Sequence, residues 1–291
     1  MSKNPVLLLE GGALRGVYTT GVLDVFMEHG LYLPQVVGVS AGALNALNYL
    51  SRQPGRGLEA NVKYLRDPRY MGATHLFRDF SFFNFDFLLN EMPKELPFDY
   101  DTFNSTSQQL WAVATDCRTG KAQFYSNKAL GQDFFTAIRA SASIPLLSSM
   151  VRVGKDVCLD GCISLAVPLP RDLPFESGPA VLVLTRNKGY RKRPLLKSQQ
   201  KLMFHRYAQH PQFLAACLSQ WETYNRQMER IDALEDRGQI FVIRPKTPIH
   251  VPNTERDPHK LDTIYRQGYA EAEELFPALS EFLSKGGYSV K

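Results

Sequence analysis

The sequence predicts an α/β fold built around a parallel β-sheet, and two observations lead to this prediction. The first 50 residues alternate between short apolar runs and segments with apolar residues at helical spacing, in the order strand, helix, strand, helix. Further apolar runs recur along the chain as far as residue 243. Strands that alternate with helices pair in parallel through right-handed crossovers, so a parallel sheet covered by helices is expected.

The N-terminal elements have the clearest patterns. Val6–Leu9 is an apolar run that enters a glycine-rich turn, which is typical of a buried central strand. A helix should follow, because apolar residues recur one turn apart after residue 16 and His29-Gly30 is a C-terminal signal. The second strand is expected at Gln35–Val39 and the second helix at Ala41–Leu50.

The later elements are assigned from the same patterns. Leu110–Thr115 and Ala122–Tyr125 should pair as strands around the turn Arg118-Thr119-Gly120. The other expected elements are a helix over Phe134–Ala140, strands over Val157–Leu159, Ala180–Leu184 and Ile240–Ile243, a long helix after Pro211, and a closing amphipathic helix over Asp262–Leu283. One stripe of the long helix is expected to face the core: Leu214, Leu218, Trp221, Asn225, Met228 and Ile231.

Residues 77–103 are rich in phenylalanine, and the spacing of these residues fits neither a helix nor a strand. The residues are Phe77, Phe80, Phe82, Phe83, Phe85, Phe87, Phe98 and Phe103. Two interpretations stand side by side: the rings form walls of an apolar pocket, or they pack the core of an irregular insertion.

The composition of the whole chain narrows the class of protein. Its 291 residues are 44% hydrophobic and 22% charged, which is ordinary for a globular protein and excludes disordered, collagenous and coiled-coil classes. No repeat, linker or composition break divides the chain, so a single domain over residues 1–291 is expected. The apolar run before Glu10 is too short for a signal peptide and no later stretch approaches a membrane span, so cytoplasmic residence is expected.

The cysteines indicate neither disulfides nor a metal site. Cys117, Cys158, Cys162 and Cys217 are too few and too scattered for a disulfide framework. The Cys158/Cys162 spacing has no second ligand pair that would complete a zinc site. We therefore expect reduced, buried thiols and neither a metal nor a cofactor.

One basic segment, Arg186–Arg193, carries five positive charges in eight residues. As a solvated loop it needs no partner, and as a functional patch it would meet anionic lipid headgroups or phosphates. No nucleic-acid-binding motif accompanies it, so nucleic acid is not an expected partner. The pattern leaves open a peripheral contact with an anionic membrane surface.

The stretch Gly38-Val39-Ser40-Ala41-Gly42 is a GxSxG motif between a predicted strand and a predicted helix. A serine on such a turn is forced into a strained backbone conformation that only small neighbours allow, and its hydroxyl stands clear of the sheet. The N-terminus of the following helix favours negative charge at the same spot. This context makes Ser40 a candidate nucleophile, with Gly38 and Gly42 as its supporting glycines.

A second anion-binding turn is expected at Glu10-Gly11-Gly12-Ala13-Leu14-Arg15-Gly16. Glycines directly after a strand let the N–H groups of Gly11, Gly12 and Ala13 converge on an anion. A dinucleotide fingerprint is the alternative, but alanine replaces its middle glycine and the second strand lacks an acidic partner at its end. The two turns would lie side by side at the ends of adjacent strands. The turn at Gly38–Gly42 would supply the nucleophile, and the turn at Glu10–Gly16 would supply the oxyanion hole.

Three residues are candidates for the base that takes the serine proton. His250 and His259 have the late position of a Ser, Asp, His triad, but His250 lies between prolines and His259 lies among charges. Asp160 ends a short strand and precedes Gly161, an arrangement that presents a carboxylate at a sheet edge. An Asp-Gly pair standing alone is more often a plain turn.

Four stretches together resemble the patatin-like phospholipase family: EGGALRG (Glu10–Gly16), GVSAG (Gly38–Gly42), ASASIP (Ala140–Pro145) and DGC (Asp160–Cys162). The resemblance covers about residues 5–190, leaving 191–291 as a C-terminal extension of helices and a strand, and VLDVF and LTRNKGYRKRP are similar to a bacterial subgroup. It implies a three-layer α/β/α sandwich around a mostly parallel central sheet. This sequence differs from the usual family pattern at two places. Cys162 stands where a smaller residue is usual, and Ser164–Pro168 lacks a polar residue that is often found before the proline.

The resemblance also implies a chemistry. Ser40 would be the nucleophile and Asp160 the base of a dyad without histidine, Gly11, Gly12 and Ala13 would form the oxyanion hole, and Arg15 would sit beside it. The reaction would be hydrolysis of carboxylic esters of phospholipids or related lipids through an acyl-enzyme, without calcium. The alternatives are a soluble carboxylesterase or thioesterase, and a non-catalytic lipid-binding or regulatory protein that keeps the fold.

Overall fold

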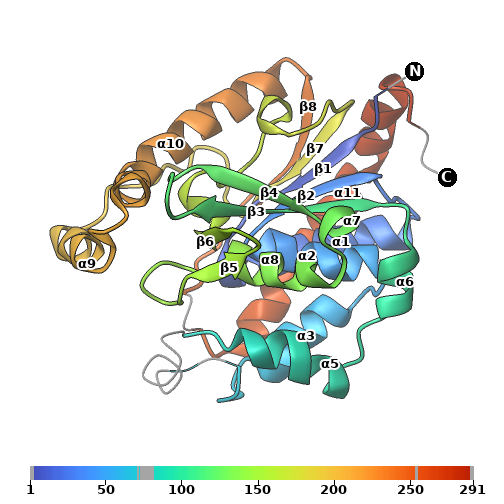
Figure 1. Cartoon of the computed structure of the whole chain (residues 1–291). Helices are drawn as coiled ribbons and strands as arrows, with labels where there is room; N and C mark the ends of the chain where they lie inside the picture. Colours follow the sequence, from blue (N-terminus) through green and yellow to red (C-terminus); the bar gives the residue numbers. More distant parts are fainter. Residues whose placement is uncertain (1–2, 71, 73–81, 253–254, 289–291) are drawn as a thin grey trace.

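An eight-stranded β-sheet forms the middle of the structure, a computed structural model that describes residues 3–70, 72, 82–252 and 255–288 (Figure 1). Its strands are β1 (Val6–Leu9), β2 (Gln35–Val39), β3 (Gln109–Asp116), β4 (Ala122–Ser126), β5 (Val151–Val153), β6 (Asp156–Asp160), β7 (Ala180–Val183) and β8 (Ile240–Ile243). They lie in the order β5-β6-β3-β2-β1-β7-β8, and β4 pairs with β3. The parallel pairs are β1 with β2 and β7, β2 with β3, and β7 with β8, so the sheet is mostly parallel, as expected.

The antiparallel part of the sheet lies at one edge. There β3 pairs antiparallel with β4 and with β6, and β5 pairs antiparallel with β6. This arrangement brings the end of β6 to the same part of the sheet as the ends of β2 and β1. Two strands that the sequence places far apart, β2 and β6, can therefore contribute to one site.

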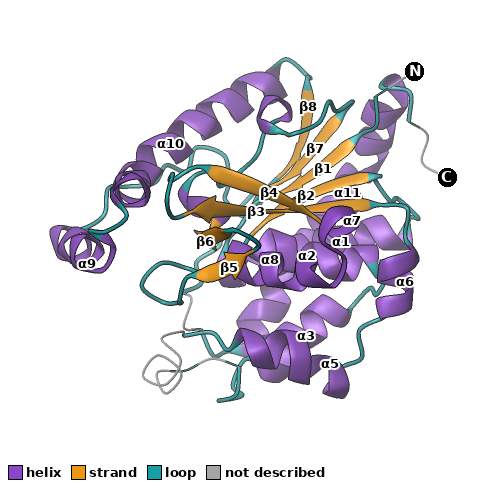
Figure 2. Cartoon of the chain, viewed as in Figure 1, coloured by secondary structure: helices purple, strands orange, loops and turns teal. Residues whose placement is uncertain are grey.

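Helices cover both faces of the sheet (Figure 2). They are α1 (Gly16–Glu28), α2 (Ala41–Leu50), α3 (Arg56–Tyr64), α5 (Met92–Glu95), α6 (Tyr100–Ser105), α7 (Asn127–Leu130), α8 (Phe134–Ser141), α9 (Lys197–Tyr207), α10 (Pro211–Asp236) and α11 (Pro258–Lys285). Leu7 and Leu9 of β1 pack in the core with α1, α2, α8 and α11, whereas Val6 and Leu8 pack in a second core with α10. The run Val6–Leu9 is apolar throughout because it is buried on both faces, and the three-layer α/β/α expectation is confirmed.

The stripe predicted for α10 is only half correct. Leu214, Met228 and Ile231 are buried, but Leu218, Trp221 and Asn225 are partly exposed. The buried face instead includes Cys217 and Tyr224, which lie between the predicted positions on the helix. The reason is that α10 packs against the sheet and also against α9, so its buried face is broad and includes a tyrosine with a polar partner.

The C-terminal residues complete the sheet and its helical cover. β8 extends the parallel sheet beside β7, and α11 packs along α1. Gly21 of α1 and Gly268 of α11 allow this approach, since a methyl group on Gly21 would lie 2.7 Å from the Tyr269 nitrogen. Within the described residues, no helix combines the length and apolar character needed to cross a bilayer.

Candidate active site

Ser40 is the single residue that links β2 to α2. Its backbone has φ 54° and ψ −121°, a conformation that costs a non-glycine residue roughly 1–3 kcal/mol and is concentrated at functional sites. A methyl group on Gly38 would lie 2.6 Å from the Ala43 nitrogen, and one on Gly42 would lie 2.5 Å from the Leu9 carbonyl oxygen. The two glycines thus let α2 start directly against the ends of the strands, with Ser40 at the edge of the sheet.

The Ser40 hydroxyl meets the carboxylate of Asp160. Ser40 Oγ donates to Asp160 Oδ2 at 2.8 Å, and the Cys162 backbone N–H donates to Asp160 Oδ1 at 2.8 Å. Both side chains are buried, with exposures of 5% for Ser40 and 3% for Asp160. Burial raises the pKa of Asp160, while the hydrogen bonds from Cys162 and Ser40 oppose this rise. The carboxyl group therefore has a higher proton affinity than an exposed aspartate.

The backbone of Asp160 is fixed by its neighbours in the sheet. Its N–H donates to the Ser143 carbonyl at 2.9 Å, and its carbonyl accepts from Thr115 Oγ1 at 2.9 Å. A methyl group on the following residue, Gly161, would collide with the Val113 carbonyl oxygen. The Asp-Gly pair is thus more than a plain turn, because glycine is the residue that lets the carboxylate enter the sheet edge at this point.

The segment Ala140–Pro145 contacts both members of the Ser40–Asp160 pair. Ser141 Oγ accepts from the Ser40 backbone N–H at 2.9 Å and donates to the Val113 carbonyl at 2.6 Å. Ser143 holds the backbone of Asp160 as described above. This segment is one of the four stretches that resemble the family, but the sequence assigned no role to its two serines. In the structure, Ser141 supports the strained turn at Ser40, and Ser143 supports Asp160.

The two histidine candidates lie elsewhere. His250 is exposed in the loop after β8, and His259 is exposed in the first turn of α11. Among the described residues, the hydroxyl of Ser40 bonds to Asp160 and to no histidine. The geometry thus brings together the serine and the aspartate and leaves both histidines apart.

The glycine turn after β1 lies against Ser40. β1 and β2 are adjacent and parallel, so their ends meet at one edge. A methyl group on Gly11 would lie 2.9 Å from Ser40 Cβ and 2.5 Å from Cys162 Sγ. Within the described part of the chain, the N–H groups of Gly11, Gly12 and Ala13 have no hydrogen-bond acceptor. Free N–H groups beside a buried serine are the donors that an oxyanion needs.

Glu10 anchors this turn, and the sequence patterns gave it no role. Its carboxylate accepts from the Thr185 backbone N–H at 2.6 Å, from Thr185 Oγ1 at 3.1 Å and from the Tyr224 hydroxyl at 3.0 Å. Thr185 Oγ1 is also 3.2 Å from the Gly11 carbonyl oxygen. The turn is therefore held from the segment directly after β7 and from α10, through a carboxylate that is 3% exposed.

Arg15 ends the short 3₁₀ helix Ala13–Arg15 that follows the glycine turn. Its Nε is buried and has no hydrogen-bond partner among the described residues. Burial lowers the pKa of Arg15, and the nearby charge of Arg186 lowers it further. The place of Arg15 beside an oxyanion hole stays a prediction.

An apolar pocket of about 130 Å³ opens at Ser40, and it is much larger than the roughly 10–15 Å³ that one water needs. Its lining includes Ser40, Ala13, Leu44, Leu47, Phe83, Phe85, Leu88, Met92, Phe98, Phe135 and Ile144. Phe83, Phe85 and Phe98 thus form pocket walls, whereas Phe87 and Phe103 are buried in the core. Phe77 and Phe80 lie outside the described residues. The two interpretations of the phenylalanine-rich stretch each hold for part of it.

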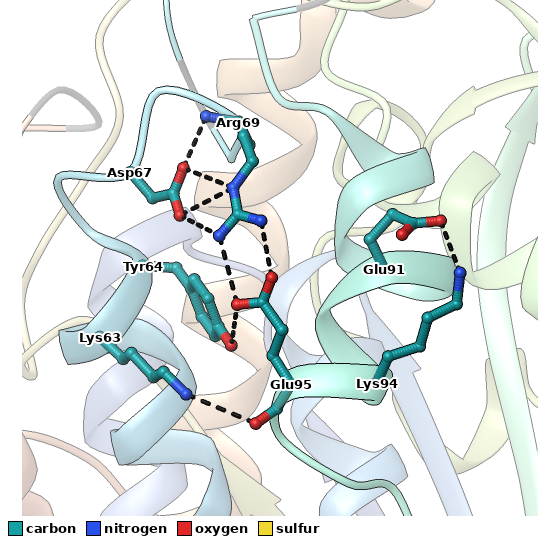
Figure 3. Close-up of polar contacts among 7 residues, drawn as sticks. All are labelled: Lys63, Tyr64, Asp67, Arg69, Glu91, Lys94 and Glu95. Atoms are coloured by element: carbon teal, nitrogen blue, oxygen red, sulfur yellow. Dashed lines mark hydrogen bonds and ion pairs between the residues drawn. The ribbon is translucent and has the colours of Figure 1, made fainter.

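A cluster of polar contacts fixes the part of the pocket wall formed by α3 and α5 (Figure 3). Arg69 donates to Asp67 Oδ2 at 2.7 Å and to Glu95 Oε1 at 2.6 Å, and the Tyr64 hydroxyl donates to Glu95 Oε2 at 3.2 Å. Lys63 also reaches the Glu95 carbonyl. Exposed ion pairs of this kind add little stability. Here these contacts fix the position of α3 relative to α5, and both helices line the pocket.

Comparison with known proteins finds similarity to family models, to a curated protein and to solved structures. The model described as patatin-like phospholipase matches residues 7–172, and a domain of unknown function (DUF6363) matches residues 210–284. The uncharacterized protein YjjU of Escherichia coli (strain K12) is 27% identical over 258 residues, which are 84% of this chain and 69% of YjjU. The crystal structure of VipD from Legionella pneumophila aligns with a TM-score of 0.47 and 13% identity, over 96% of this chain and 67% of VipD.

Proposed function

The chain belongs to the patatin-like phospholipase family, whose model matches more than half of it, and we propose that it hydrolyses lipid esters with Ser40 as nucleophile and Asp160 as base. The observation that carries this proposal is the 2.8 Å hydrogen bond between the two side chains in a buried strand-to-helix elbow. A nucleophile needs a base within hydrogen-bond reach, and this pair meets that requirement.

The reaction would proceed in two steps. Ser40 Oγ attacks the ester carbonyl while Asp160 accepts the hydroxyl proton, and the oxyanion lies near the free N–H groups of Gly11, Gly12 and Ala13. Collapse of the intermediate breaks the ester bond, and Asp160 returns the proton to the leaving alcohol. Water then attacks the acyl-enzyme with Asp160 again as base, which releases the fatty acid and restores Ser40.

The substrate's acyl chain would occupy the apolar pocket that opens at Ser40. Its lining is mostly aliphatic and aromatic, as expected for a site that removes a hydrocarbon chain from water. Among the polar lining residues, Arg56 already donates to the Asn48 side chain and to the carbonyl groups of Pro97 and Leu96, so these donors are not free for a polar ligand. This favours a lipid ester over a short polar ester.

We further propose that residues 1–291 work as one domain. The C-terminal residues supply Tyr224 to the anchor of the glycine turn and β8 to the sheet. The region matched by the domain of unknown function would then support the catalytic turn directly.

Labelling with a fluorescent fluorophosphonate tests the mechanism, because this probe reacts only with an activated serine. We expect the wild-type protein to label, Ser40→Ala to remain unlabelled, and His250→Asn and His259→Asn to label at the wild-type rate. An unlabelled wild type, or a silent histidine variant, would contradict the dyad and reopen the choice between a triad hydrolase and a binding protein.

We also propose that the region around α9 contacts anionic membranes. Leu196, Leu202 and Phe204 are exposed by 69%, 51% and 51%. Residues 177–221 contain eight lysines and arginines and no acidic residue. Figure 1 shows α9 at the periphery of the molecule, away from the sheet. Exposed apolar side chains among cations suit the surface of an anionic bilayer.

Vesicle flotation tests this contact. The protein should float with phosphatidylcholine vesicles that contain phosphatidylserine and not with pure phosphatidylcholine. Leu202→Ser/Phe204→Ser should bind at least about tenfold more weakly, because two apolar side chains no longer enter the interface. The matched control His205→Ser, exposed on the same helix, should bind like wild type. Equal flotation of the double variant and wild type would exclude α9 as the contact.

A further inference from the structure

Two polar side chains of α10 reach the two turns of the candidate active site. Gln220 and Tyr224 lie one helical turn apart, so they project from the same side of α10. Gln220 Nε2 donates to the Cys162 carbonyl oxygen at 2.7 Å, in the turn after β6. The Tyr224 hydroxyl donates to Glu10 Oε1 at 3.0 Å, directly before the glycine turn after β1. One helix therefore holds both turns.

The bond from Gln220 acts on the residue that orients Asp160. The Cys162 N–H donates to Asp160 Oδ1 at 2.8 Å, and the other carboxylate oxygen, Oδ2, accepts from Ser40. The N–H and the carbonyl of Cys162 belong to the two planar peptide groups that meet at its Cα. A carbonyl fixed by Gln220 therefore also restrains the Cα from which this N–H extends, and through it the carboxylate.

The bond from Tyr224 acts on the opposite turn. Glu10 directly precedes Gly11, the first of the residues whose free N–H groups are proposed to hold the oxyanion. The two turns also lie against each other, since a methyl group on Gly11 would be 2.5 Å from Cys162 Sγ. The distance between the two turns thus sets the distance between Asp160 and the proposed oxyanion donors.

The part of α10 that carries both side chains is anchored on either side of them. Before Gln220, Cys217 packs in a buried cluster with Leu159 of β6. After Tyr224, Met228 packs in the second core with Leu8 of β1. A helix that is fixed to the sheet in this way can keep two turns at a constant spacing.

We propose that Gln220 is a positioning residue for Asp160, and that Gln220 and Tyr224 together set the spacing between the base and the oxyanion donors. The effect on turnover rests on the proposed hydrolase function, whereas the contact of α10 with the two turns does not. Both residues lie within residues 210–284, the region matched by the domain of unknown function. That region would then complete the catalytic geometry.

Gln220→Met tests this role, because methionine keeps the length of the side chain and removes the donor. With p-nitrophenyl butyrate as a soluble ester, kcat should fall roughly 10- to 100-fold, the scale of a small misplacement of reacting groups. KM should stay near the wild-type value, since Gln220 is not among the described residues that line the pocket. Tyr224→Phe should also lower kcat, because Glu10 loses one of its donors.

Gln227→Met is the matched control. Gln227 lies on the same helix and also donates to a backbone carbonyl, that of Val167 at 3.1 Å, but Val167 belongs to neither turn of the active site. Gln227 is 6% exposed, so its loss should disturb packing at least as much as the loss of the partly exposed Gln220. Gln227→Met should nevertheless keep the wild-type kcat.

The pH profile separates positioning from a general loss of stability. The hydrogen bond from the Cys162 N–H opposes the rise in the pKa of Asp160. Loosening this bond in Gln220→Met raises that pKa further, so the acid limb of kcat/KM should move to higher pH. Gln227→Met and Tyr224→Phe should keep the wild-type limb. A fall in kcat of less than about fivefold for Gln220→Met, or an equal fall for Gln227→Met, would overturn the role of Gln220.

Hydrogen exchange tests the contact of α10 with the turn without any turnover. The amides of Gly161–Leu165 should exchange faster with deuterium in Gln220→Met than in wild type or Gln227→Met, because the turn has lost a restraint. If wild type neither hydrolyses the ester nor reacts with the fluorophosphonate, the hydrolase proposal fails and this measurement alone decides whether Gln220 holds the turn. Unchanged exchange would overturn that too. Should Gln220→Met fail to fold, Gln220→Asn, one methylene shorter, gives the same comparison.

Discussion

Replacing Asp160 by asparagine is expected to lower kcat by roughly 10³- to 10⁴-fold without loss of the fold. The substitution keeps the shape of the side chain, and its amide oxygen can still accept from the Cys162 N–H. What it removes is the group that takes the Ser40 proton. Steady-state hydrolysis of a lipid ester and the rate of fluorophosphonate labelling should fall together, since both need the activated serine.

The fold of this variant is checked by its melting temperature. Burial raises the pKa of Asp160 in the folded protein, so this group favours folding at pH values below its unfolded pKa, and that contribution is lost as the pH rises through the folded pKa. At neutral pH the neutral asparagine should therefore melt no lower than wild type. Asp156→Asn, at the other end of β6, is the matched control and should keep wild-type kcat. A kcat for Asp160→Asn above about a tenth of wild type would be incompatible with its role as the base.

The raised pKa of Asp160 also sets the acid limb of the wild-type pH profile. The carboxyl group must be ionised to accept the proton, so kcat/KM should fall as the pH drops through the raised pKa. The limb should lie above about 3.9, the value of an unperturbed aspartate. Asp160→Asn should lack this limb in whatever activity remains.

The parts of the site that could be predicted from sequence are those set by local sterics. Gly38 and Gly42 are required because Ala43 and Leu9 approach within a distance that excludes a side chain. Gly161 is required for the same reason, against the Val113 carbonyl. The Gly38 constraint acts within one turn, and those at Gly42 and Gly161 act against the adjacent strands β1 and β3. Each fixes a glycine within two residues of Ser40 or Asp160, so together they leave short motifs in the sequence. The burial of Val6–Leu9 on both faces likewise leaves a continuous apolar run.

The parts that could not be predicted depend on contacts between distant residues. Glu10 bonds to Thr185 and Tyr224, which lie 175 and 214 positions away. Nothing in the local sequence of Tyr224 marks it, since it occupies one position in a long amphipathic helix. The same holds for the basic segment Arg186–Arg193: the five charges in eight residues predict a basic patch, but only the fold shows which of them pair with carboxylates of α10.

Replacing Gly11 by alanine is expected to lower kcat at least about 10²-fold, the scale of losing an oxyanion donor. The added methyl group would lie 2.5 Å from Cys162 Sγ, 2.9 Å from Ser40 Cβ and 3.0 Å from the Val39 carbonyl oxygen. The turn must therefore move away from Ser40, or Ser40 must leave its place beside Asp160. Either shift separates the nucleophile from the N–H groups proposed to hold the oxyanion.

Variants at Cys162 test which of the three contacts of the added methyl group would lower kcat. Cys162→Ala alone removes Sγ and should keep kcat near wild type, since the backbone N–H of this residue still donates to Asp160 Oδ1. In the double variant Gly11→Ala/Cys162→Ala, the contacts with Ser40 Cβ and the Val39 carbonyl remain, so kcat should stay low. Full recovery in the double variant would mean that only the thiol is crowded. A wild-type kcat for Gly11→Ala itself would mean that the turn after β1 takes no part in the reaction, and the oxyanion donors would then have to come from the N-terminus of α2 alone.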